Sequence, residues 1–227
     1  MKEKEAMQAI VFDDFGDPDV LVLRETARPE VRPHDLLVRN VSIGVNRADM
    51  SHRKGAYGRA YFGDSDIMGL EIAGTVVETG PEVQGYSVGD RVMGIVGGGA
   101  YAEFSRIDHR MAMKVPESLS LVDAGGVAEV FVTAHEALFH LARLQPGESV
   151  LIHAAAGGVG SAAVQLAHAA GARVFATASG DKHEAVMGFG ADEVIDYRTD
   201  DFQAAVTEKT QVDAKAIASD VVVVLAI

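Results

Sequence analysis

A glycine-rich turn between two apolar runs is the part of the sequence whose residue types and spacing point most directly to chemistry. The first run covers residues 150–153, the turn covers residues 155–160, and an alanine-rich run continues to residue 170. Small residues in such a turn let a pyrophosphate approach backbone N–H groups. The start of the following helix presents further N–H groups and the positive end of its dipole. This arrangement predicts a dinucleotide-binding site.

The context of the turn supports this prediction more than the glycines alone do. A second apolar run, residues 173–178, lies at the distance expected for a βαβ unit. Ala155 stands where the first glycine of a G-x-G-x-x-G pattern would lie. The alternative interpretation is a tight turn in an α/β domain that binds no nucleotide. The residues predicted to contact the cofactor here are Ala155, Ala156, Gly157, Gly158, Val159 and Gly160.

The end of the second predicted strand indicates which dinucleotide binds. A carboxylate there would accept hydrogen bonds from the ribose 2′-hydroxyl of NAD, but residues 177–180 read Thr-Ala-Ser-Gly. Ser179 and Lys182 offer a hydroxyl and a cation to a 2′-phosphate, so the sequence predicts NADPH. Asp181 is a signal against this choice, although a residue beyond a glycine can point to solvent. An ordinary exposed lysine is the alternative interpretation of Lys182.

The composition argues against several classes of function. The 227-residue chain has a formal net charge of −13, which argues against binding to nucleic acid or to an anionic membrane. It has no cysteine, and its eight histidines lack ligand spacing, so disulfides, thiolate metal sites and a cysteine nucleophile are excluded. The charged N-terminus does not resemble a signal peptide, and the apolar run at 221–227 is too short to span a membrane. We therefore expect a cytoplasmic protein.

The hydrophobic pattern divides the chain into a β domain and an α/β domain. Residues 1–6 are expected to form a flexible extension. Residues 7–119 contain short alternating segments, at 8–12, 20–24, 35–45, 72–78, 91–96 and 100–104, which is typical of a barrel-like β domain. Residues 120–227 are expected to form an NADP-binding domain. It would hold a helix at 120–142, the βαβ unit, strands at 192–197 and 221–225, and a helix at 201–210. The predicted fold class is α/β.

Six motifs in unbroken order resemble the medium-chain dehydrogenase/reductase superfamily, and within it the zinc-independent quinone oxidoreductase branch of the zeta-crystallin type. They read GVNRAD from Gly44, GLEIAG from Gly69, VGDRV from Val88, GGAYAEF from Gly98 and TAHEAL from Thr133, followed by the turn at 155–160. The resemblance covers about residues 7–210. It implies a GroES-like β-barrel domain followed by a Rossmann-type, doubly wound parallel sheet.

The resemblance also implies a reaction. Zinc-dependent relatives carry a catalytic cysteine and a Gly-His-Glu motif, whereas here there is no cysteine and Leu70 replaces that histidine. The expected activity is metal-free hydride transfer from NADPH to quinones or other α,β-unsaturated carbonyls, which need no Lewis acid to stabilise an alkoxide. The alternatives are an enoyl-thioester reductase and a catalytically inactive nucleotide-binding protein.

The same resemblance suggests roles for individual residues. Asn46 matches the family asparagine near the nicotinamide and the reacting carbonyl; a turn-capping role is an equally good interpretation. Tyr57 would supply a phenolic donor or proton, or would only pack in its loop. Glu71 would hold the domain junction. Thr133 would contact the nicotinamide end of the cofactor, and Tyr197 would stack near its adenosine.

The C-terminal part departs from the family pattern. Relatives continue after the helix equivalent to 201–210 with a glycine-rich link, a fourth strand and two more strand–helix units, but this sequence lacks that link and stops at residue 227. We therefore expect an apparently C-terminally truncated form with an incomplete Rossmann domain, which is either a truncated or frame-altered product or a shortened natural variant. Strands 3, 2, 1 and 4 of the order 3-2-1-4-5-6 would be present, leaving the nicotinamide half incomplete. The last strand would be an unprotected edge, and the usual family dimer would be unavailable.

Overall fold

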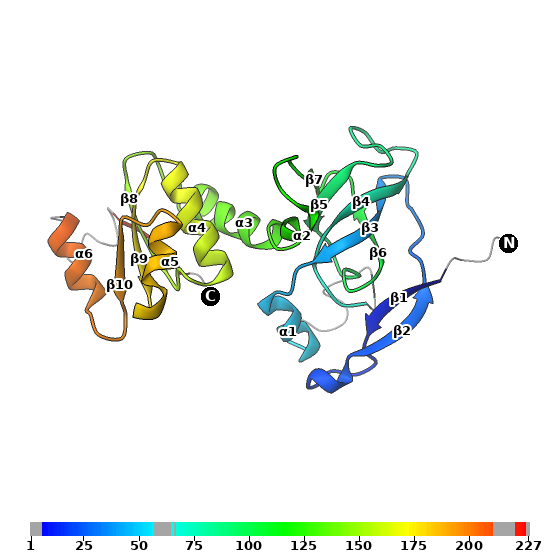
Figure 1. The fold of residues 1–227 in the computed structure, drawn as a ribbon, viewed down its shortest axis with the longest axis horizontal. Coiled ribbons are helices and arrows are strands. Elements are labelled where there is room, and N and C mark those ends of the chain that lie inside the picture. The colour runs from blue at the N-terminus through cyan, green and yellow to red at the C-terminus, as the bar shows by residue number, and fades with distance from the viewer. Residues whose placement is uncertain (1–5, 57–64, 66, 211–220, 226–227) are drawn as a thin grey trace. The chain divides into compact units, whose positions relative to one another are not determined.

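The computed structural model describes residues 6–56, 65, 67–210 and 221–225. The chain divides into two compact units, Met1–Glu129 and Val130–Ile227 (Figure 1). Each unit has its own sheet and its own hydrophobic core.

The first unit is built on a five-stranded antiparallel sheet with the order β6-β3-β4-β5-β7. Side chains alternate between the two faces of a strand, and one face of β3 and β4 completely buries Leu36, Val38, Ile72 and Val76. A separate antiparallel pair, β1 with β2, adds a smaller cluster. The strands are β1 (Ala6–Val11), β2 (Val22–Ala27), β3 (Asp35–Ile43), β4 (Glu71–Thr79), β5 (Arg91–Ile95), β6 (Phe104–Asp108) and β7 (Ala112–Lys114).

Short helices connect these strands. A 3₁₀ turn, η1 (Pro18–Val20), precedes β2, α1 (Arg47–Arg53) follows β3, and α2 (Leu121–Ala124) follows β7. The Ser120 hydroxyl accepts a hydrogen bond from the Asp123 N–H at 3.0 Å, which caps the start of α2. Because α2 packs on β3 and β4, residues 120–124 belong with the first unit.

The segment predicted as one helix at 120–142, and as the start of the second domain, is divided in the structure. It forms α2, then α3 (Ala128–His135) and a π-helical segment, η2 (Glu136–Leu141). Gly125 and Gly126 separate α2 from α3, and glycine has a low helix propensity. The first compact unit therefore extends to Glu129, beyond the boundary that the sequence places at residue 120.

The second unit contains a four-stranded parallel sheet with the order β10-β9-β8-β11. Its strands are β8 (Ser149–His153), β9 (Arg173–Ala178), β10 (Glu193–Asp196) and β11 (Val221–Leu225). The helical segments between them are α4 (Gly158–Ala169), the 3₁₀ turn η3 (Gly180–Lys182), α5 (His183–Gly188) and α6 (Phe202–Thr210).

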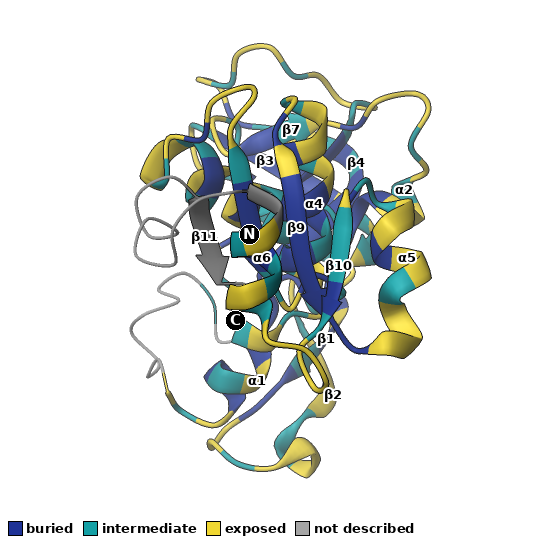
Figure 2. Cartoon of the chain, turned by 90° about the vertical axis from the view of Figure 1, so that its left-hand side faces the viewer, coloured by how far each residue is buried: buried dark blue, intermediate teal, exposed yellow. Residues whose placement is uncertain are grey.

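Helices cover both faces of this sheet. Val150 and Ile152 of β8 pack against the alanine-rich face of α4, while Leu151, between them, shares a second cluster with Val206 of α6. Figure 2 shows the consequence for β9, which is buried along most of its length. Burial on both faces is typical of a parallel strand in a doubly wound fold.

The predicted fold class and the strand order 3-2-1-4 are confirmed by this arrangement. The strand predicted at 100–104 is wrong, because β6 begins only at Phe104. Residues 99–101 instead donate backbone hydrogen bonds to the carbonyls of Ile67, Gly69 and Met68, after two glycines with positive φ. The sequence missed β7 and α5, which are short.

Candidate dinucleotide-binding site

A pocket of about 470 Å³ lies at the carboxyl ends of β8, β9 and β10. Ligands of open α/β sheets bind at this edge, and the volume falls within the range of roughly 300–1,000 Å³ usual for small-molecule pockets. Five of the ten predicted cofactor-binding residues line it. The full lining is His153, Ala154, Ala156, Gly157, Thr177, Ala178, Ser179, Lys182, Tyr197 and Phe202.

The turn between β8 and α4 has the geometry that an anion site needs. Ala154 has a left-handed φ of 51°, and the Gly157 N–H donates to its carbonyl oxygen at 2.9 Å. A Cβ at Gly160 would lie 2.3 Å from the same oxygen, so only glycine lets α4 start this close to the strand. In the described structure no side chain caps α4 at Gly157. Its first N–H groups therefore suit a pyrophosphate, and the site fits a dinucleotide.

Ser179 and Lys182, which follow β9, also line this pocket. Ser179 is 6% exposed. Asp181 is exposed, as the sequence suggested, and the neighbouring Ser179 hydroxyl lowers the pKa of its carboxyl. Tyr197 is 55% exposed at the pocket edge, where a ring is available for stacking.

Five of the lining residues were not predicted from the sequence, and three of these, His153, Thr177 and Phe202, contact one another. His153 Nδ1 lies 3.1 Å from the Thr177 Oγ1, and the rings of His153 and Phe202 meet edge to face with centroids 4.8 Å apart. Burial lowers the pKa of His153, so its imidazole is neutral near pH 7. The signal that could have found them is their position directly at strand ends or at the start of a following helix.

The other predicted cofactor-binding residues are placed differently. Ala155 is completely buried and its N–H donates to the Thr177 carbonyl at 3.0 Å, so it ties β8 to β9. Gly158, Val159 and Gly160 form the first turn of α4. Thr133 is exposed on α3 and does not line the pocket. The cofactor contacts of all these residues stay predictions.

Asn46, the predicted catalytic amide, lies at the start of α1 in the first unit. Its Nδ2 donates to Glu71 Oε2 at 2.9 Å. Glu71 is 1% exposed, and its Oε1 also accepts the N–H group of Glu129 at 2.8 Å. A Cβ at Gly44 would lie 1.9 Å from Glu71 Oε2, so the bare backbone there makes room for the carboxylate. One N–H of the Asn46 side-chain amide thus donates to Glu71, and the second N–H is available to another acceptor.

Tyr57, the other predicted catalytic residue, lies outside the described residues.

Asp49 and Tyr101 complete this cluster. Asp49 is 2% exposed, and its Oδ2 accepts from the Asn46 N–H at 2.8 Å and from the Tyr101 hydroxyl at 3.0 Å. Its Oδ1 has no hydrogen-bond partner in the described structure. Burial raises the pKa of Asp49, of Glu71 and of Glu129, and the nearby Glu71 and Asp49 carboxylates raise that of Glu129 further. Burial, followed by the Asp49 charge, raises the pKa of Tyr101, which keeps the phenol protonated.

These shifts predict that the three buried carboxyls stabilise the first unit more as the pH falls from 7 towards 5, whereas His52, whose pKa is lowered by burial, contributes in the opposite direction. The three carboxyls lose their protons at higher pH in the folded than in the unfolded chain. Above their ordinary values of 3.8 to 4.5, the folded state therefore binds more protons, and the free energy of unfolding declines as pH rises. Asp90 and Asp108 have lowered pKa values. Their stabilising contribution to the free energy of unfolding is therefore lost only below about pH 4.

Urea unfolding at several pH values measures this slope. Because general charge repulsion in an acidic chain also eases at low pH, the informative comparison is between two variants. Asp49→Asn should flatten the slope, whereas Asp19→Asn, which changes an exposed carboxylate of η1, should leave it as in the unaltered protein. Equal slopes in both variants would show that the buried cluster does not titrate as described.

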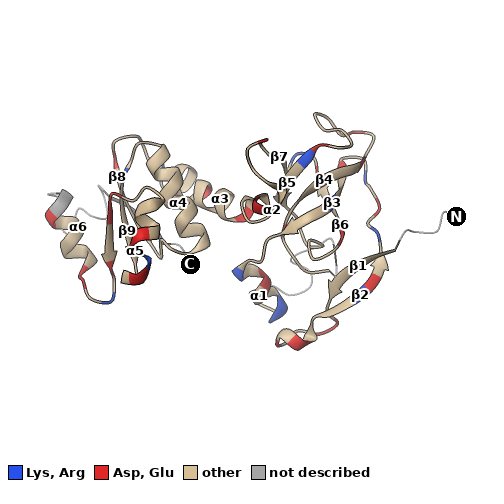
Figure 3. Cartoon of the chain, viewed as in Figure 1, with Lys and Arg blue, Asp and Glu red and all other residues tan. Residues whose placement is uncertain are grey.

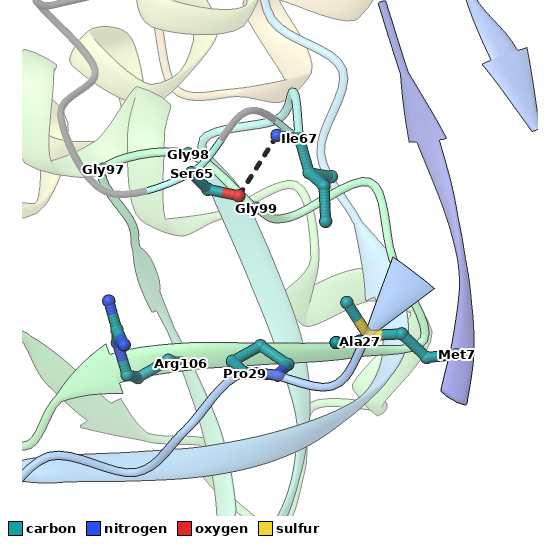
Figure 4. A pocket seen from close by; sticks show the side chains of 9 residues that line it. All are labelled: Met7, Ala27, Pro29, Ser65, Ile67, Gly97, Gly98, Gly99 and Arg106. Carbon is teal, nitrogen blue, oxygen red and sulfur yellow. Dashed lines mark hydrogen bonds between the residues drawn. The ribbon is translucent and has the colours of Figure 1, made fainter. Parts of the chain in front are cut away.

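A second pocket, of about 180 Å³, lies in the first unit (Figure 4). Met7, Ala27 and Pro29 line one side, and Gly97–Gly99, Ser65 and Ile67 line the other, with Arg106 at one end. Arg106 already contacts Asp35 Oδ2 at 3.0 Å and the Glu30 carbonyl at 3.1 Å. This pocket is too small for a dinucleotide.

The described residues contain neither a group of metal ligands nor a membrane-spanning helix. No three or more His, Cys, Asp or Glu side chains come together there in a way that would hold a metal ion. No helix in the described part of the chain combines the length and apolar character needed to cross a bilayer.

Two protein families match consecutive parts of the chain. Residues 32–143 match the alcohol dehydrogenase GroES-like domain, and residues 158–224 match zinc-binding dehydrogenase. An alcohol dehydrogenase superfamily protein from Novosphingobium aromaticivorans is 36% identical, with a TM-score of 0.85 over 97% of this chain and 73% of its own. This chain belongs to the medium-chain dehydrogenase/reductase superfamily. The resemblance seen in the sequence is thereby confirmed.

Other solved members of the superfamily differ in what they are described as doing. The quinone oxidoreductase from Coxiella burnetii is 35% identical with a TM-score of 0.80, covering 88% of this chain and 65% of its own. The CurK enoyl reductase is 32% identical with a TM-score of 0.81, covering 91% and 64%. A mycobacterial protein in complex with NADPH is 35% identical with a TM-score of 0.78, covering 90% and 63%.

A much longer superfamily relative is the type I polyketide synthase Pks15/1 of Mycobacterium marinum, which acts in phenolphthiocerol synthesis. It is 44% identical over 177 residues, which are 76% of this chain but 8% of the synthase. The chain thus spans a small part of this relative and just under two thirds of the quinone oxidoreductase from Coxiella burnetii.

Proposed function

We propose that this protein binds NADPH in the pocket at the ends of β8–β10 and transfers hydride to quinones or other α,β-unsaturated carbonyls. The observation that carries the proposal is the uncapped, glycine-built start of α4 beside a pocket that also contains Lys182. A nicotinamide coenzyme supplies the hydride when it is bound. The N–H groups of Gly158 and Val159 would hold its pyrophosphate.

The choice of NADPH rests on the pocket residues that follow β9 and β10. Lys182 would pair with a 2′-phosphate, and Tyr197 would cover the adenosine. The NADPH complex of the mycobacterial relative supports the same choice.

The substrate class follows from what Asn46 offers and from what the sequence lacks. When a conjugated carbonyl accepts a hydride at its β carbon, negative charge develops on its oxygen. The second N–H of the Asn46 amide, oriented by Glu71, would donate to that oxygen. The sequence has no cysteine and has Leu70 where zinc-dependent relatives have histidine, which supports a reaction without zinc. Tyr57 is proposed to return the proton.

An enoyl-thioester reductase is a second candidate of nearly equal weight. It would use the same cofactor pocket and the same Asn46 donor, because an enoyl thioester is also a conjugated carbonyl. The similarity to the CurK enoyl reductase and to a polyketide synthase favours it. A nucleotide-binding protein without turnover is the third, since the strand order described here holds mainly the adenosine half of a Rossmann sheet.

Steady-state oxidation of NADPH separates these candidates. With 1,4-benzoquinone as acceptor we expect turnover at least tenfold faster than with a crotonyl thioester, because the quinone is the more activated acceptor. A rate advantage for the thioester would favour the enoyl reductase instead. NADPH binding without turnover of either acceptor would favour the nucleotide-binding protein.

The expected cytoplasmic location and the expected absence of nucleic-acid, membrane and dimer partners stay predictions.

A further inference from the structure

The Tyr101 side chain contacts α1 from a loop that lies far from this helix in the sequence. Its hydroxyl donates to Asp49 Oδ2 at 3.0 Å, and the same oxygen accepts the backbone N–H of Asn46 at 2.8 Å. One carboxylate oxygen thus joins a phenol to the residue whose side-chain amide is proposed to meet the substrate carbonyl. Tyr101 does not line the candidate dinucleotide pocket, so cofactor binding there does not account for this contact.

The fold fixes the Tyr101 ring against the backbone. The Tyr101 N–H donates to the Met68 carbonyl, and the Tyr101 carbonyl accepts the Ile10 N–H, both at 2.8 Å. A Cβ at Gly69, where φ is 93°, would lie 2.2 Å from Tyr101 Cδ1, so only glycine leaves room for the ring. The hydroxyl is therefore held at Asp49 by its surroundings on both sides of the chain.

The negative charge of Asp49 depends on the two donors at Oδ2. Asp49 is 2% exposed, and its other oxygen, Oδ1, has no hydrogen-bond partner in the described part of the chain. Basic residues precede and follow Asp49 along α1 (Figure 3). Burial raises the pKa of Asp49, and the hydrogen bonds from the Asn46 N–H and the Tyr101 hydroxyl oppose that rise. Loss of the Tyr101 hydroxyl would raise this pKa further, and a protonated Asp49 would hold the Asn46 N–H less strongly.

We propose that Tyr101, through Asp49, holds the backbone of Asn46 so that its side-chain amide keeps one orientation. The inference rests on the proposed role of Asn46 and names Tyr101 as a positioning residue for it. Glu71 holds the Asn46 side chain at Nδ2, and Asp49 holds the Asn46 backbone N–H. With both contacts made, the second N–H of the amide is directed at one place, where a substrate carbonyl oxygen would receive it.

The test follows the backbone amide resonance of Asn46 by NMR as the pH is varied, in the unaltered full chain and in Tyr101→Phe. In the unaltered protein this resonance should report the ionisation of Asp49 through their hydrogen bond. In Tyr101→Phe the midpoint should rise by about one pH unit, because the carboxylate loses one hydrogen bond. Tyr86→Phe is the matched control, since it removes the hydroxyl of another half-buried tyrosine, which donates to the Ala112 carbonyl. Its midpoint should move by less than ~0.3 pH unit.

A third variant identifies the group that titrates. The other titratable groups that interact with Asp49 are Tyr101, His52, Glu71 and Glu129. Asp49→Asn leaves all four in place and should abolish the step in the Asn46 resonance. A step that persists in Asp49→Asn, or equal midpoints in Tyr101→Phe and the unaltered protein, would overturn the inference. An equal shift in Tyr86→Phe would also overturn it, because the effect would then not be specific to Asp49.

Turnover gives a second readout. With 1,4-benzoquinone, Tyr101→Phe should lower kcat about tenfold near pH 6 and less at pH 8, where Asp49 is ionised in both proteins. NADPH affinity should change less than twofold, because the candidate pocket lies in the second unit. An unchanged kcat at pH 6 would contradict the inference. Absence of turnover by the unaltered protein would contradict the proposed function instead, and the titration of Asn46 would then decide on Tyr101.

Discussion

Gly158→Asp is expected to weaken NADPH binding at least 100-fold while leaving the fold intact. The new carboxylate would sit in the first turn of α4, where no side chain caps the helix in the described structure. It would accept the N–H groups that suit the pyrophosphate and would repel that anion. Loss of two or more charge-assisted hydrogen bonds corresponds to about 3 kcal/mol.

The position tolerates the side chain itself. A Cβ at Gly158 would lie 3.0 Å from Val130 Cγ1, the end of a side chain that can shift. An acidic residue in the first turn also stabilises a helix by about 0.3–1 kcal/mol. Thermal unfolding of Gly158→Asp should therefore stay near that of the unaltered protein. Gly188→Asp is the matched control, because nothing lies within 4 Å of a Cβ there and Gly188 does not line the pocket. Similar NADPH affinities for the two variants would contradict the assignment of the anion site.

Glu71→Ala should cost the first unit about 3–5 kcal/mol of its free energy of unfolding. Glu71 is the acceptor for two donors, Asn46 Nδ2 and the Glu129 N–H group. Removing it leaves these donors without their acceptor beside a new cavity. Part of the loss is offset, because the buried charge of Glu71 is also removed.

Chemical denaturation monitored by circular dichroism, together with calorimetry, measures this loss in the free energy of unfolding. Glu78→Ala is the matched control, since Glu78 lies on the same strand, β4, and is exposed. It should change the free energy of unfolding by less than about 0.5 kcal/mol. Glu71→Gln, which keeps one acceptor oxygen, should fall between the two. A Glu71→Ala protein within 1 kcal/mol of the unaltered one would show that the carboxylate does not organise Asn46 and α3.

The second unit could be predicted largely from the sequence because its signals are local. Residues 149–178 form a strand, a turn, a helix and a second strand, and each of these is encoded by neighbouring residues. The glycines, the alanine-rich helix and Gly171 agree with one another there. The short α5 and the division at Gly125 were missed, because a few residues carry too weak a periodic signal.

The sequence indicated individual residues around Glu71, such as Asn46, but it did not predict that they contact one another. The hydrogen bond between Asn46 and Glu71 joins residues 25 positions apart, and the one from Glu129 spans 58. Only the tertiary fold brings these groups together. The same holds for Tyr101, which meets Asp49 across 52 positions and was visible in the sequence only as part of a motif.

Calorimetric titration of the full chain with NADPH tests the central claim, that the edge formed by β8, β9 and β10 is a dinucleotide site. The account predicts one site per chain, with a dissociation constant below about 100 µM. It also predicts competition by adenosine 2′,5′-bisphosphate, which fills only the adenosine end. Absence of binding at millimolar NADPH, or binding that the bisphosphate does not displace, would contradict it.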